Sequence, residues 1–286
     1  MKYAFMKAHL NQFPVAPMAR VLGVCRSGFY RWMKSGVSRI SIKQQELDER
    51  VKSVFEAHKG RYGAPRVQRE LSELGVHRNE KTIAASLKRL RLRAKAAKRF
   101  KATTYSDHGL PVAENLLEQD FHADHPNEKY VQDITYISTN EGWLYLAVVI
   151  DLYSRQVVGW SMNERMKAGL VCDALTMALF RRGLPKGVIV HSDRGSQYCS
   201  RGFQQLVKHH QLRCSMSKKG DCYDNACAET FFHSLKIELI HGARYHTREE
   251  AKHAIFEYIE TYYNRVRRHS SIGYISPVEF EAKSVA

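Results

Sequence analysis

The stretch between residues 130 and 236 most constrains the fold, because it places carboxylates where a packed core tolerates none. Asp133 lies within the run YVQDITYI, whose β-branched and aromatic residues predict a strand at residues 130–137. The alternation of a strand puts Asp133 on one face with Val131 and Ile137. An ionised carboxylate on such an apolar face is unfavourable unless a cation or hydrogen-bond donors meet it. The sequence therefore predicts that Asp133 has a functional partner.

Two further carboxylates lie beside predicted elements. Asp193 comes directly after the short apolar run of residues 188–192, and strand ends in open α/β sheets are where ligands usually bind. Glu229 lies at the edge of the apolar face of a helix predicted from Asp224 to about His241. Two strand aspartates and one helix glutamate make an oxygen-rich site that suits hard divalent cations. Two such ions about 3.5–4 Å apart can stabilise both oxygens of an in-line phosphoryl displacement.

These residues and their surroundings resemble the DDE transposases of bacterial insertion sequences, and specifically their second-frame product, OrfB. Asp193 and Glu229 are separated by 35 residues, as in the D,D(35)E motif of that family, and Lys236 follows Glu229 by seven residues. The other matching segments are GWLYL at 142–146, DLYSR at 151–155, HSDRGSQY at 191–198, YN at 263–264, RHS at 268–270 and GY at 273–274. One departure is Tyr130, where relatives commonly carry tryptophan, and we expect it to affect packing rather than chemistry.

The resemblance implies a DNA transposase, a polynucleotidyl transferase with endonuclease activity. Water would cut an element end to free a 3′-OH, which then attacks a second strand without a covalent protein intermediate. Asp133 would bind both of two Mg²⁺ (or Mn²⁺) ions, with Asp193 and Glu229 completing one each. Lys236 would hold the DNA end, and the further expected DNA contacts are Asn225, Arg194, Gln197, Arg268 and His269.

The order of elements after residue 130 is the one that the resemblance implies, an α/β RNase H-like core of the retroviral-integrase type. Three antiparallel strands come first, and helices then alternate with strands. The predicted strands are 130–137, 144–151, 156–161, 188–191 and about 212–216, and the predicted helices are 168–182, 203–210, 224–241 and 249–264.

The net charge of +16 lies entirely in the N-terminal part of the chain. Residues 1–110 contain 24 Lys and Arg against 8 Asp and Glu, whereas residues 111–286 contain 21 of each kind. Such asymmetry indicates a polyanion-binding module attached to a neutral catalytic domain. A merely solvated basic surface is the alternative, although concentrated like charge repels itself.

Two helix-turn-helix patterns lie in this basic region. In the first, at residues 15–35, Pro17 can open one helix and Ser27 can cap a second helix that carries cations. Its expected DNA contacts are Arg26, Arg31 and Lys34. The alternative is a helical hairpin that only packs on its neighbour.

The second pattern follows a helix predicted at residues 43–58. A break at residues 60–65 begins another helix that ends near Gly75, and Asn79 can cap a third helix that ends at about Leu90. The run from Lys88 to Lys101 holds eight cations and no acid, which favours an arm that contacts DNA phosphates over a solvated face. The expected contacts are Lys88, Arg89, Arg91, Arg93 and Lys95.

These patterns predict four parts of the chain. Residues 1–42 would form an N-terminal helix-turn-helix, and residues 43–110 would form a second one with its basic arm. Residues 111–125 would be a linker into an integrase-type catalytic core with a C-terminal helix, at residues 126–286. The all-α DNA-binding region would thus precede the catalytic α/β domain.

The expected partners are DNA, as terminal inverted repeats and target, and a second copy of the protein on DNA. The first-frame protein OrfA is a further expected partner, because the family's second-frame product is often made as a fusion with it. The longest strictly apolar stretch, residues 144–150, is too short to span a bilayer, and no secretory signal is visible. We therefore expect a protein of the bacterial cytoplasm, associated with the nucleoid and not with a membrane.

Other chemistries remain to be weighed. A metal-dependent nuclease without strand transfer would have the same fold, and a DNA-binding regulator would have an inactive core. The chain also holds residues that resemble the Arg/His/Tyr set of tyrosine recombinases, namely Arg265, Arg268, His269 and Tyr274. In such an enzyme, however, the three carboxylates would have no role. Six cysteines without a C-x-x-C pair favour reduced thiols over a zinc site.

Overall fold

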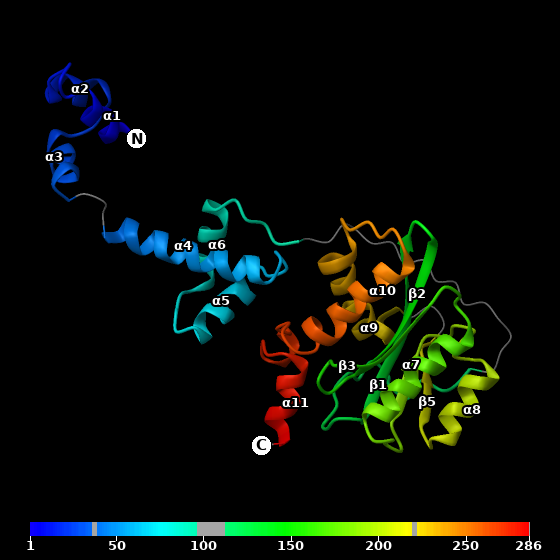
Figure 1. Cartoon of the computed structure of the whole chain (residues 1–286). Coiled ribbons are helices and arrows are strands. Elements are labelled where there is room, and N and C mark those ends of the chain that lie inside the picture. Colours follow the sequence, from blue (N-terminus) through cyan, green and yellow to red (C-terminus); the bar gives the residue numbers. More distant parts are fainter. Residues whose placement is uncertain (36–38, 96–111, 219–221, 286) are drawn as a thin grey trace. The chain divides into compact units, whose positions relative to one another are not determined.

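The computed structural model describes residues 1–35, 39–95, 112–218 and 222–285, and it divides into two compact units, Met1–Ala94 and Lys95–Ala286 (Figure 1). The part of the predicted basic run beyond Lys95 lies outside the described residues, as does residue 111 of the predicted linker. Each unit has its own hydrophobic core.

The first three helices are α1 (Lys2–Ala8), α2 (Val15–Val21) and α3 (Arg26–Ser35). They share a small core of Met6, Met18, Ala19 and Phe29. The predicted helix pair at residues 15–35 is confirmed by α2 and α3, whereas α1 is too short to produce a clear periodic pattern. Ser27 lies inside α3 rather than before it, and the sulfur of Cys25 accepts a hydrogen bond from the N–H of Gly28 at 3.3 Å instead.

Three further helices of this unit are α4 (Arg39–Ala57), α5 (Ala64–Glu73) and α6 (Glu80–Arg89). The Asn79 side chain accepts a hydrogen bond from the N–H of Thr82 at 2.8 Å, so the predicted cap of α6 is confirmed. This cap fixes the start of the last helix of the predicted second helix-turn-helix.

The second unit is built on a five-stranded mixed sheet. Its strand order is β3-β2-β1-β4-β5, with β1, β2 and β3 antiparallel and β1, β4 and β5 parallel. The predicted strands are confirmed within two residues, and their observed bounds are Lys129–Thr139, Gly142–Asp151, Val157–Asn163, Ile189–Ser192 and Arg213–Met216.

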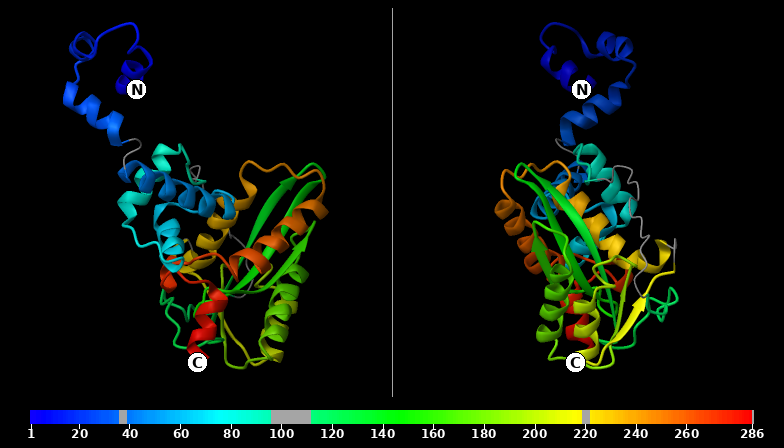
Figure 2. Two further views of the ribbon diagram at one scale, coloured as in Figure 1. Left: turned by 60° about the vertical axis from the view of Figure 1, so that its left-hand side comes forward. Right: turned by 90° about the vertical axis from the view of Figure 1, so that its right-hand side faces the viewer.

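Strand alternation assigns the side chains of this sheet to two cores (Figure 2). Ala147 and Val149 of β2 pack with α7 (Ala168–Arg181) and α8 (Arg201–His209). Leu146 and Val148 of the same strand pack on the other side, in a core shared with three helical segments. Those segments are α9 (Ala226–Leu235), α10 (Arg248–Phe256) and the π-helical turn η3 (Glu257–Tyr263).

Gly159 of β3 permits the close approach of α7. A Cβ atom at this position would lie 2.2 Å from the carbonyl oxygen of Ala174 and 2.7 Å from the nitrogen of Ala178. Backbone atoms cannot move aside as a side chain can, so any larger residue would push the helix off the sheet.

Replacing Gly159 by alanine should lower the free energy of unfolding by about 1–3 kcal/mol, because the helix must shift to admit the methyl group. Gly169→Ala in α7 is the matched control, since a Cβ there meets nothing within 4 Å. That control should be neutral or stabilising by up to about 1 kcal/mol. Urea denaturation followed by circular dichroism measures both, and equal midpoints for the two variants would contradict this account.

Two helices differ from their predicted form. The helix predicted to His241 ends as α9 at Leu235 and continues as a π-helical turn, η2 (Lys236–Ile240). Glu238 of η2 is buried, where Arg267 pairs with it at 2.7 Å and the Tyr258 hydroxyl donates to it at 3.0 Å. The helix predicted at 249–264 likewise ends in η3. A π turn adds one residue to a helical turn, and hydrophobic periodicity does not distinguish this change.

The predicted linker packs on the second unit. Leu117 is 2% exposed in the core beneath α9, and the Leu116 N–H donates to the Ser215 hydroxyl of β5 at 2.8 Å. The side chain of Asn115 donates to Asp224 at 3.0 Å. The C-terminal helix α11 (Pro277–Val285) completes the unit, and the sequence analysis had not predicted its position.

Candidate active site

Asp133 lies where the pairing of β1 with β4 ends. The parallel register joins Lys129, Tyr130 and Val131 to β4, and Asp133 follows just beyond. Asp193 comes directly after Ser192, the last residue of β4. The carboxyl ends of parallel strands share one edge of a sheet, so the two carboxylates emerge side by side there.

Backbone donors orient both aspartates. The N–H of Ile134 donates to Asp133 at 2.7 Å, and the N–H of Gly195 donates to Asp193 at 2.9 Å. A Cβ atom at position 195 would lie 2.9 Å from the Asp193 Oδ1 atom, so glycine here lets the carboxylate keep its position against the backbone. The local sequence therefore holds both carboxylates before any ligand arrives.

Glu229 lies on α9, which covers the same face of β1 that carries Asp133. Its neighbours Ala228 and Phe231 are buried in the core, whereas Glu229 is exposed. The protein around its carboxyl group still removes part of the water, and this desolvation raises the pKa of Glu229. Glu229 is therefore held at the boundary between the core and solvent, as the predicted helix face requires.

The three carboxylates interact through their charges. Burial and the charge of Asp193 raise the pKa of Asp133 well above its usual range, and Glu229 adds to this effect. The N–H of Ile134 and the charge of Lys236 act in the opposite direction. The site thus concentrates negative charge that protein cations only partly offset.

A divalent cation fits the chemistry of this donor set. Carboxylate oxygens are the ligands that Mg²⁺ and Mn²⁺ prefer, and a cation would relieve the repulsion around Asp133. Among the residues that the structure describes, no three His, Cys, Asp or Glu side chains already stand close enough to hold a metal ion. The alternative zinc site of cysteines and histidines is likewise not assembled within those residues.

Lys236 lies at the first position of η2, and its Nζ atom lies 5.8 Å from the centre of the Tyr136 ring. Burial lowers the pKa of Lys236, while the charges of Tyr136 and Asp133 raise it. The structure therefore brings the predicted lysine within electrostatic range of Asp133, beside an aromatic ring that the sequence analysis did not single out.

The expected DNA contacts near Asp193 differ in their surroundings. The half-buried Arg194 donates from Nε to the Ser217 carbonyl at 2.7 Å, and Gln197 donates to the Met166 carbonyl at 3.2 Å. Asn225 is 6% exposed and donates to the carbonyl of Gln132 at 3.0 Å. Its role in this structure is to join the start of α9 to β1, because its side chain is not accessible to DNA.

The C-terminal candidates are also engaged in the fold. Arg268 is 7% exposed and donates to the Tyr274 carbonyl at 2.9 Å, so it stabilises its own loop instead of facing a phosphate. His269 is half-buried, and its ring lies beside the Ser271 hydroxyl at 2.9 Å. Burial of Arg268 removes from the surface one member of the set that a tyrosine recombinase would need.

Most N-terminal candidates lie on the surface of their elements. Those with exposed side chains are Arg26, Arg31, Lys34, Lys88, Arg91, Arg93 and Lys95. Arg89 is exposed as well, with 38% of its side chain accessible, but it binds Asp48 of α4 through two bonds, at 2.6 and 3.1 Å, and thereby holds α6 against α4. Lys95 donates to the carbonyl of Glu238 at 2.9 Å. The structure therefore gives Arg89 and Lys95 roles within the fold.

Tyr198 is a residue of the site that sequence reasoning missed, although it closes the segment HSDRGSQY. Tyr198 is 1% exposed, and its hydroxyl has no hydrogen-bond partner within the described parts of the chain. Burial and the charges of Asp133 and Asp193 raise its pKa well above the usual tyrosine value. A neutral hydroxyl is thus buried beside the two carboxylates, and its place shortly after Asp193 was the available signal.

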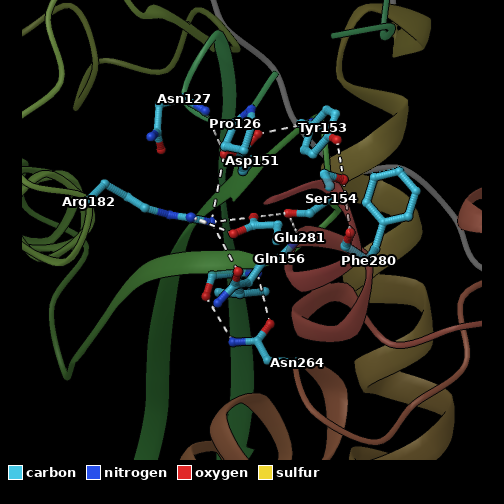
Figure 3. A network of polar contacts seen from close by, with 12 residues as sticks. Pro126, Asn127, Asp151, Tyr153, Ser154, Gln156, Arg182, Asn264, Phe280 and Glu281 are labelled. Carbon is cyan, nitrogen blue, oxygen red and sulfur yellow. Dashed lines mark hydrogen bonds and ion pairs between the residues drawn. The ribbon is translucent and has the colours of Figure 1, made fainter. Parts of the chain in front are cut away.

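Asp151 belongs to a separate network at the far end of β2 (Figure 3). It is fully buried and accepts hydrogen bonds from the N–H groups of Asn127 and Tyr153, both at 2.9 Å. Arg182 lies 3.7 Å from Asp151 and binds Glu281 of α11 through both guanidinium nitrogens at 2.6 Å. These contacts give Asp151 a structural role outside the candidate active site.

Models of known protein families match most of the chain. One model described as "Integrase core domain" matches residues 123–222, and a second model with the same description matches residues 229–285. A model described as "HTH-like domain" matches residues 42–100. Together with the mixed sheet, these matches define a protein with an α/β integrase-type core and a helix-turn-helix-like domain before it, which confirms the predicted fold class.

Sequence identity to known proteins identifies the family within this class. The chain is 56% identical over its full length to "Transposase InsF for insertion sequence IS3A" of Escherichia coli (strain K12), and it covers all of that protein. It is 45% identical to "Insertion element IS600 uncharacterized 31 kDa protein" of Shigella sonnei, over 93% of this chain and 98% of that one. The chain therefore belongs to this family of insertion-sequence transposases.

Two solved structures are among those that match the chain. The simian T-cell lymphotropic virus intasome in complex with PP2A regulatory subunit B56 gamma matches with a TM-score of 0.48 and 16% identity, over 81% of this chain and 74% of that chain. The HTLV-2 integrase catalytic core domain in complex with magnesium matches with a TM-score of 0.42 and 16% identity, over 56% of this chain and 99% of that chain.

Within the described residues, no helix is long and apolar enough to cross a membrane.

Proposed function

We propose that this transposase cuts the ends of its insertion sequence and joins each freed 3′-hydroxyl to a second DNA strand, with Asp133, Asp193 and Glu229 as the catalytic carboxylates. The observation that carries this proposal is the meeting of Asp133 and Asp193 at the end of β4, with Glu229 near enough to raise the pKa of Asp133. Carboxylates that repel one another at a partly buried site have no structural benefit of their own, so their clustering supports a cation site there.

The three carboxylates would hold two divalent ions, Mg²⁺ or Mn²⁺. When bound, such ions supply positive charge to the attacking and leaving oxygens of a phosphoryl transfer. The N–H groups of Ile134 and Gly195 keep the two aspartates oriented, so little reorganisation is needed at the sheet edge. Glu229 approaches from α9, and the neutral Tyr198 hydroxyl can donate a hydrogen bond to either aspartate.

DNA would be held on both units. In the second unit, Lys236 supplies a cation beside Asp133 for the end of the element. In the first unit, the exposed Arg26, Arg31 and Lys34 of α3 would contact phosphates, as would Lys88, Arg91 and Arg93 at the end of α6 and beyond it. A second copy of the chain, and OrfA as a partner or fusion, would complete the assembly on DNA.

The test is incubation of the full chain with labelled ends of its own insertion sequence, target DNA and Mg²⁺. A denaturing gel separates hydrolysed ends from joined strands. We expect both cleaved and joined products. Cleavage without joining would instead show a nuclease, and binding without either product would show a regulator with an inactive core.

Replacing Arg26 and Lys34 together by glutamine should weaken DNA binding equally for all sequences. The slope of log K against log[salt] should become less steep by about 1 for each phosphate that the variant no longer neutralises. Arg89→Gln is the control, because Arg89 pairs with Asp48 and its removal should lower Tm but leave the salt slope unchanged. Fluorescence anisotropy at several salt concentrations measures the slopes, and an unchanged slope in the double variant would exclude a phosphate-binding role for the two residues.

A further inference from the structure

Tyr136 and Trp143 form an exposed aromatic pair near the tip of the hairpin between β1 and β2. They are 47% and 49% exposed, and their ring centres lie 5.0 Å apart with the planes at 84°. The register pairs Tyr136 with Tyr145 and Ser138 with Trp143, so both rings stand on one face of the sheet as diagonal neighbours. Leaving two large aromatic rings in water is unfavourable. Their exposure side by side therefore indicates a surface that binds a ligand.

The backbone under this pair is fixed. Thr139 donates to the Gly142 carbonyl across the turn at 2.7 Å, and the N–H of Asn140 donates to the Tyr245 carbonyl at 3.0 Å. Arg248, at the start of α10, donates from Nε to the carbonyl of Trp143 at 3.1 Å. The two rings are therefore presented by a braced hairpin, which lowers the entropy lost when a ligand binds.

Lys236 connects the aromatic pair to the candidate active site. Its Nζ atom lies 5.8 Å from the centre of the Tyr136 ring, and its charge also acts on Asp133. The described pairing of β1 with β4 stops at Val131, short of both Asp133 and Tyr136. Tyr136 follows Asp133 by three positions, about 10 Å along the strand, and strand alternation places the two side chains on opposite faces of β1. Lys236 is near both, so a DNA strand would pass from the carboxylates to the ring around this edge of β1. That distance is on the scale of one or two nucleotides.

We propose that Tyr136 and Trp143 form a stacking site for an unpaired DNA base next to the bond that is cut, with Lys236 beside the adjoining phosphate. The proposal rests on the function proposed above. Bases of any sequence can stack on aromatic side chains, and a cation next to the rings matches the phosphate that accompanies each base. One ring can lie against the base while the perpendicular ring closes its side. Holding one base unpaired would keep the element end open beside the carboxylates.

The experiment places 2-aminopurine at the nucleotides that flank the scissile bond of an element end. Stacking on an aromatic ring quenches the fluorescence of this base. With the full chain and Ca²⁺ in place of Mg²⁺, we expect strong quenching by the wild type and little by Tyr136→Leu or Trp143→Leu. In Mg²⁺ the same variants should cleave a fully paired end about 5- to 150-fold more slowly, which corresponds to about 1–3 kcal/mol per stacked base.

Three comparisons make this result specific. Trp143→Phe keeps a ring and should retain most of the quenching. Phe180→Leu changes another exposed aromatic residue, 67% exposed on α7, and should alter neither readout. An element end with mismatched terminal nucleotides is already unpaired, so it should restore much of the cleavage by Trp143→Leu. Because both rings are half exposed, the leucine variants should keep nearly the wild-type Tm.

Distinct outcomes would overturn each proposal. If the wild type cleaves and joins DNA but quenching survives in both leucine variants, the stacking site is wrong and the transposase function stands. If the variants change the oligomeric state without changing quenching, the aromatic pair is a protein interface instead. If the wild type quenches 2-aminopurine but neither cleaves nor joins, the proposed function fails while the stacking site remains.

Discussion

Asp133→Asn, Asp193→Asn and Glu229→Gln should each reduce DNA-end cleavage by about 10³-fold or more, while DNA binding survives. Removing a metal ligand takes several kcal/mol of charge stabilisation from the transition state, and each 1.36 kcal/mol is a factor of about ten in rate. The substitutions keep the size of each side chain, so packing around β1, β4 and α9 should persist. Cleavage of labelled element ends in Mg²⁺ and anisotropy of the same DNA provide the two measurements.

Asp173→Asn is the matched control, because Asp173 is an exposed carboxylate on α7 outside the candidate site. It should cleave like the wild type. A readout independent of catalysis is the rise in Tm on adding Mg²⁺, which follows from binding to the folded state alone. That rise should be present in the wild type and in Asp173→Asn, and it should be small in Asp133→Asn. Any of the three carboxylate variants that still cleaves substantially must be removed from the catalytic set.

Asp133→Asn should raise the stability of the fold in the absence of metal, although it lowers cleavage. Without metal, the wild type must bury Asp133 beside Asp193 and Glu229, and this raises the pKa of Asp133. An uncharged amide avoids that repulsion, so the variant should be more stable than the wild type in metal-free buffer. Gains of about 0.5–2 kcal/mol are common where a functional site is relieved in this way.

Sequence reasoning located the paired aspartates because two local signals agreed. The alternation of β1 predicted the face that carries Asp133, and the apolar run before Asp193 predicted a strand end. Parallel pairing of β1 with β4 then brings these two ends together. The spacing between Asp193 and Glu229 supplied the third residue through the resemblance to a known family. Each step needed only the period of a strand or helix, or a motif in the text.

The remaining features depend on tertiary interactions that no local pattern encodes. Asn225 and Arg268 are polar residues in family-like segments, yet their side chains satisfy carbonyl groups inside the fold. Arg89 belongs to a basic run, but its partner Asp48 lies 41 positions earlier on another helix. The Tyr136 ring looked like part of a strand pattern. Its exposure follows from the end of the β4 pairing at Val131, which is a tertiary property.

The network around Arg182 predicts the largest stability effect outside the candidate active site. Arg182 is only partly accessible, and its guanidinium joins Glu281 of α11 to Asp151 at the end of β2 and to Gln156. Arg182→Met keeps most of the side-chain volume but leaves two largely buried carboxylates without their cation. Removing one partner of a buried ion pair costs about 3–5 kcal/mol. Urea denaturation at pH 8 should show a loss of that size.

Arg181→Met is the neighbouring control, because Arg181 pairs with Glu260 at 2.6 Å while its side chain is 41% exposed. Exposed pairs contribute about 0–1 kcal/mol, so this variant should unfold nearly like the wild type. Equal losses for the two arginines would show that burial around Asp151 does not control the effect.

The penalty for Arg182→Met should also depend on pH. Burial raises the pKa of Asp151 from 3.8 to about 6 in the wild type, and Arg182 partly offsets that rise. A raised carboxyl pKa means that the folded state binds more protons than the unfolded state between pH 4 and pH 6, so stability falls as pH rises through that range. Without Arg182 the pKa should rise further and extend the fall above pH 6. The variant should therefore lose less stability at pH 5, where Asp151 can be protonated, than at pH 8. A penalty that is larger at pH 5 would contradict the assignment of Arg182 as the cation that stabilises ionised Asp151.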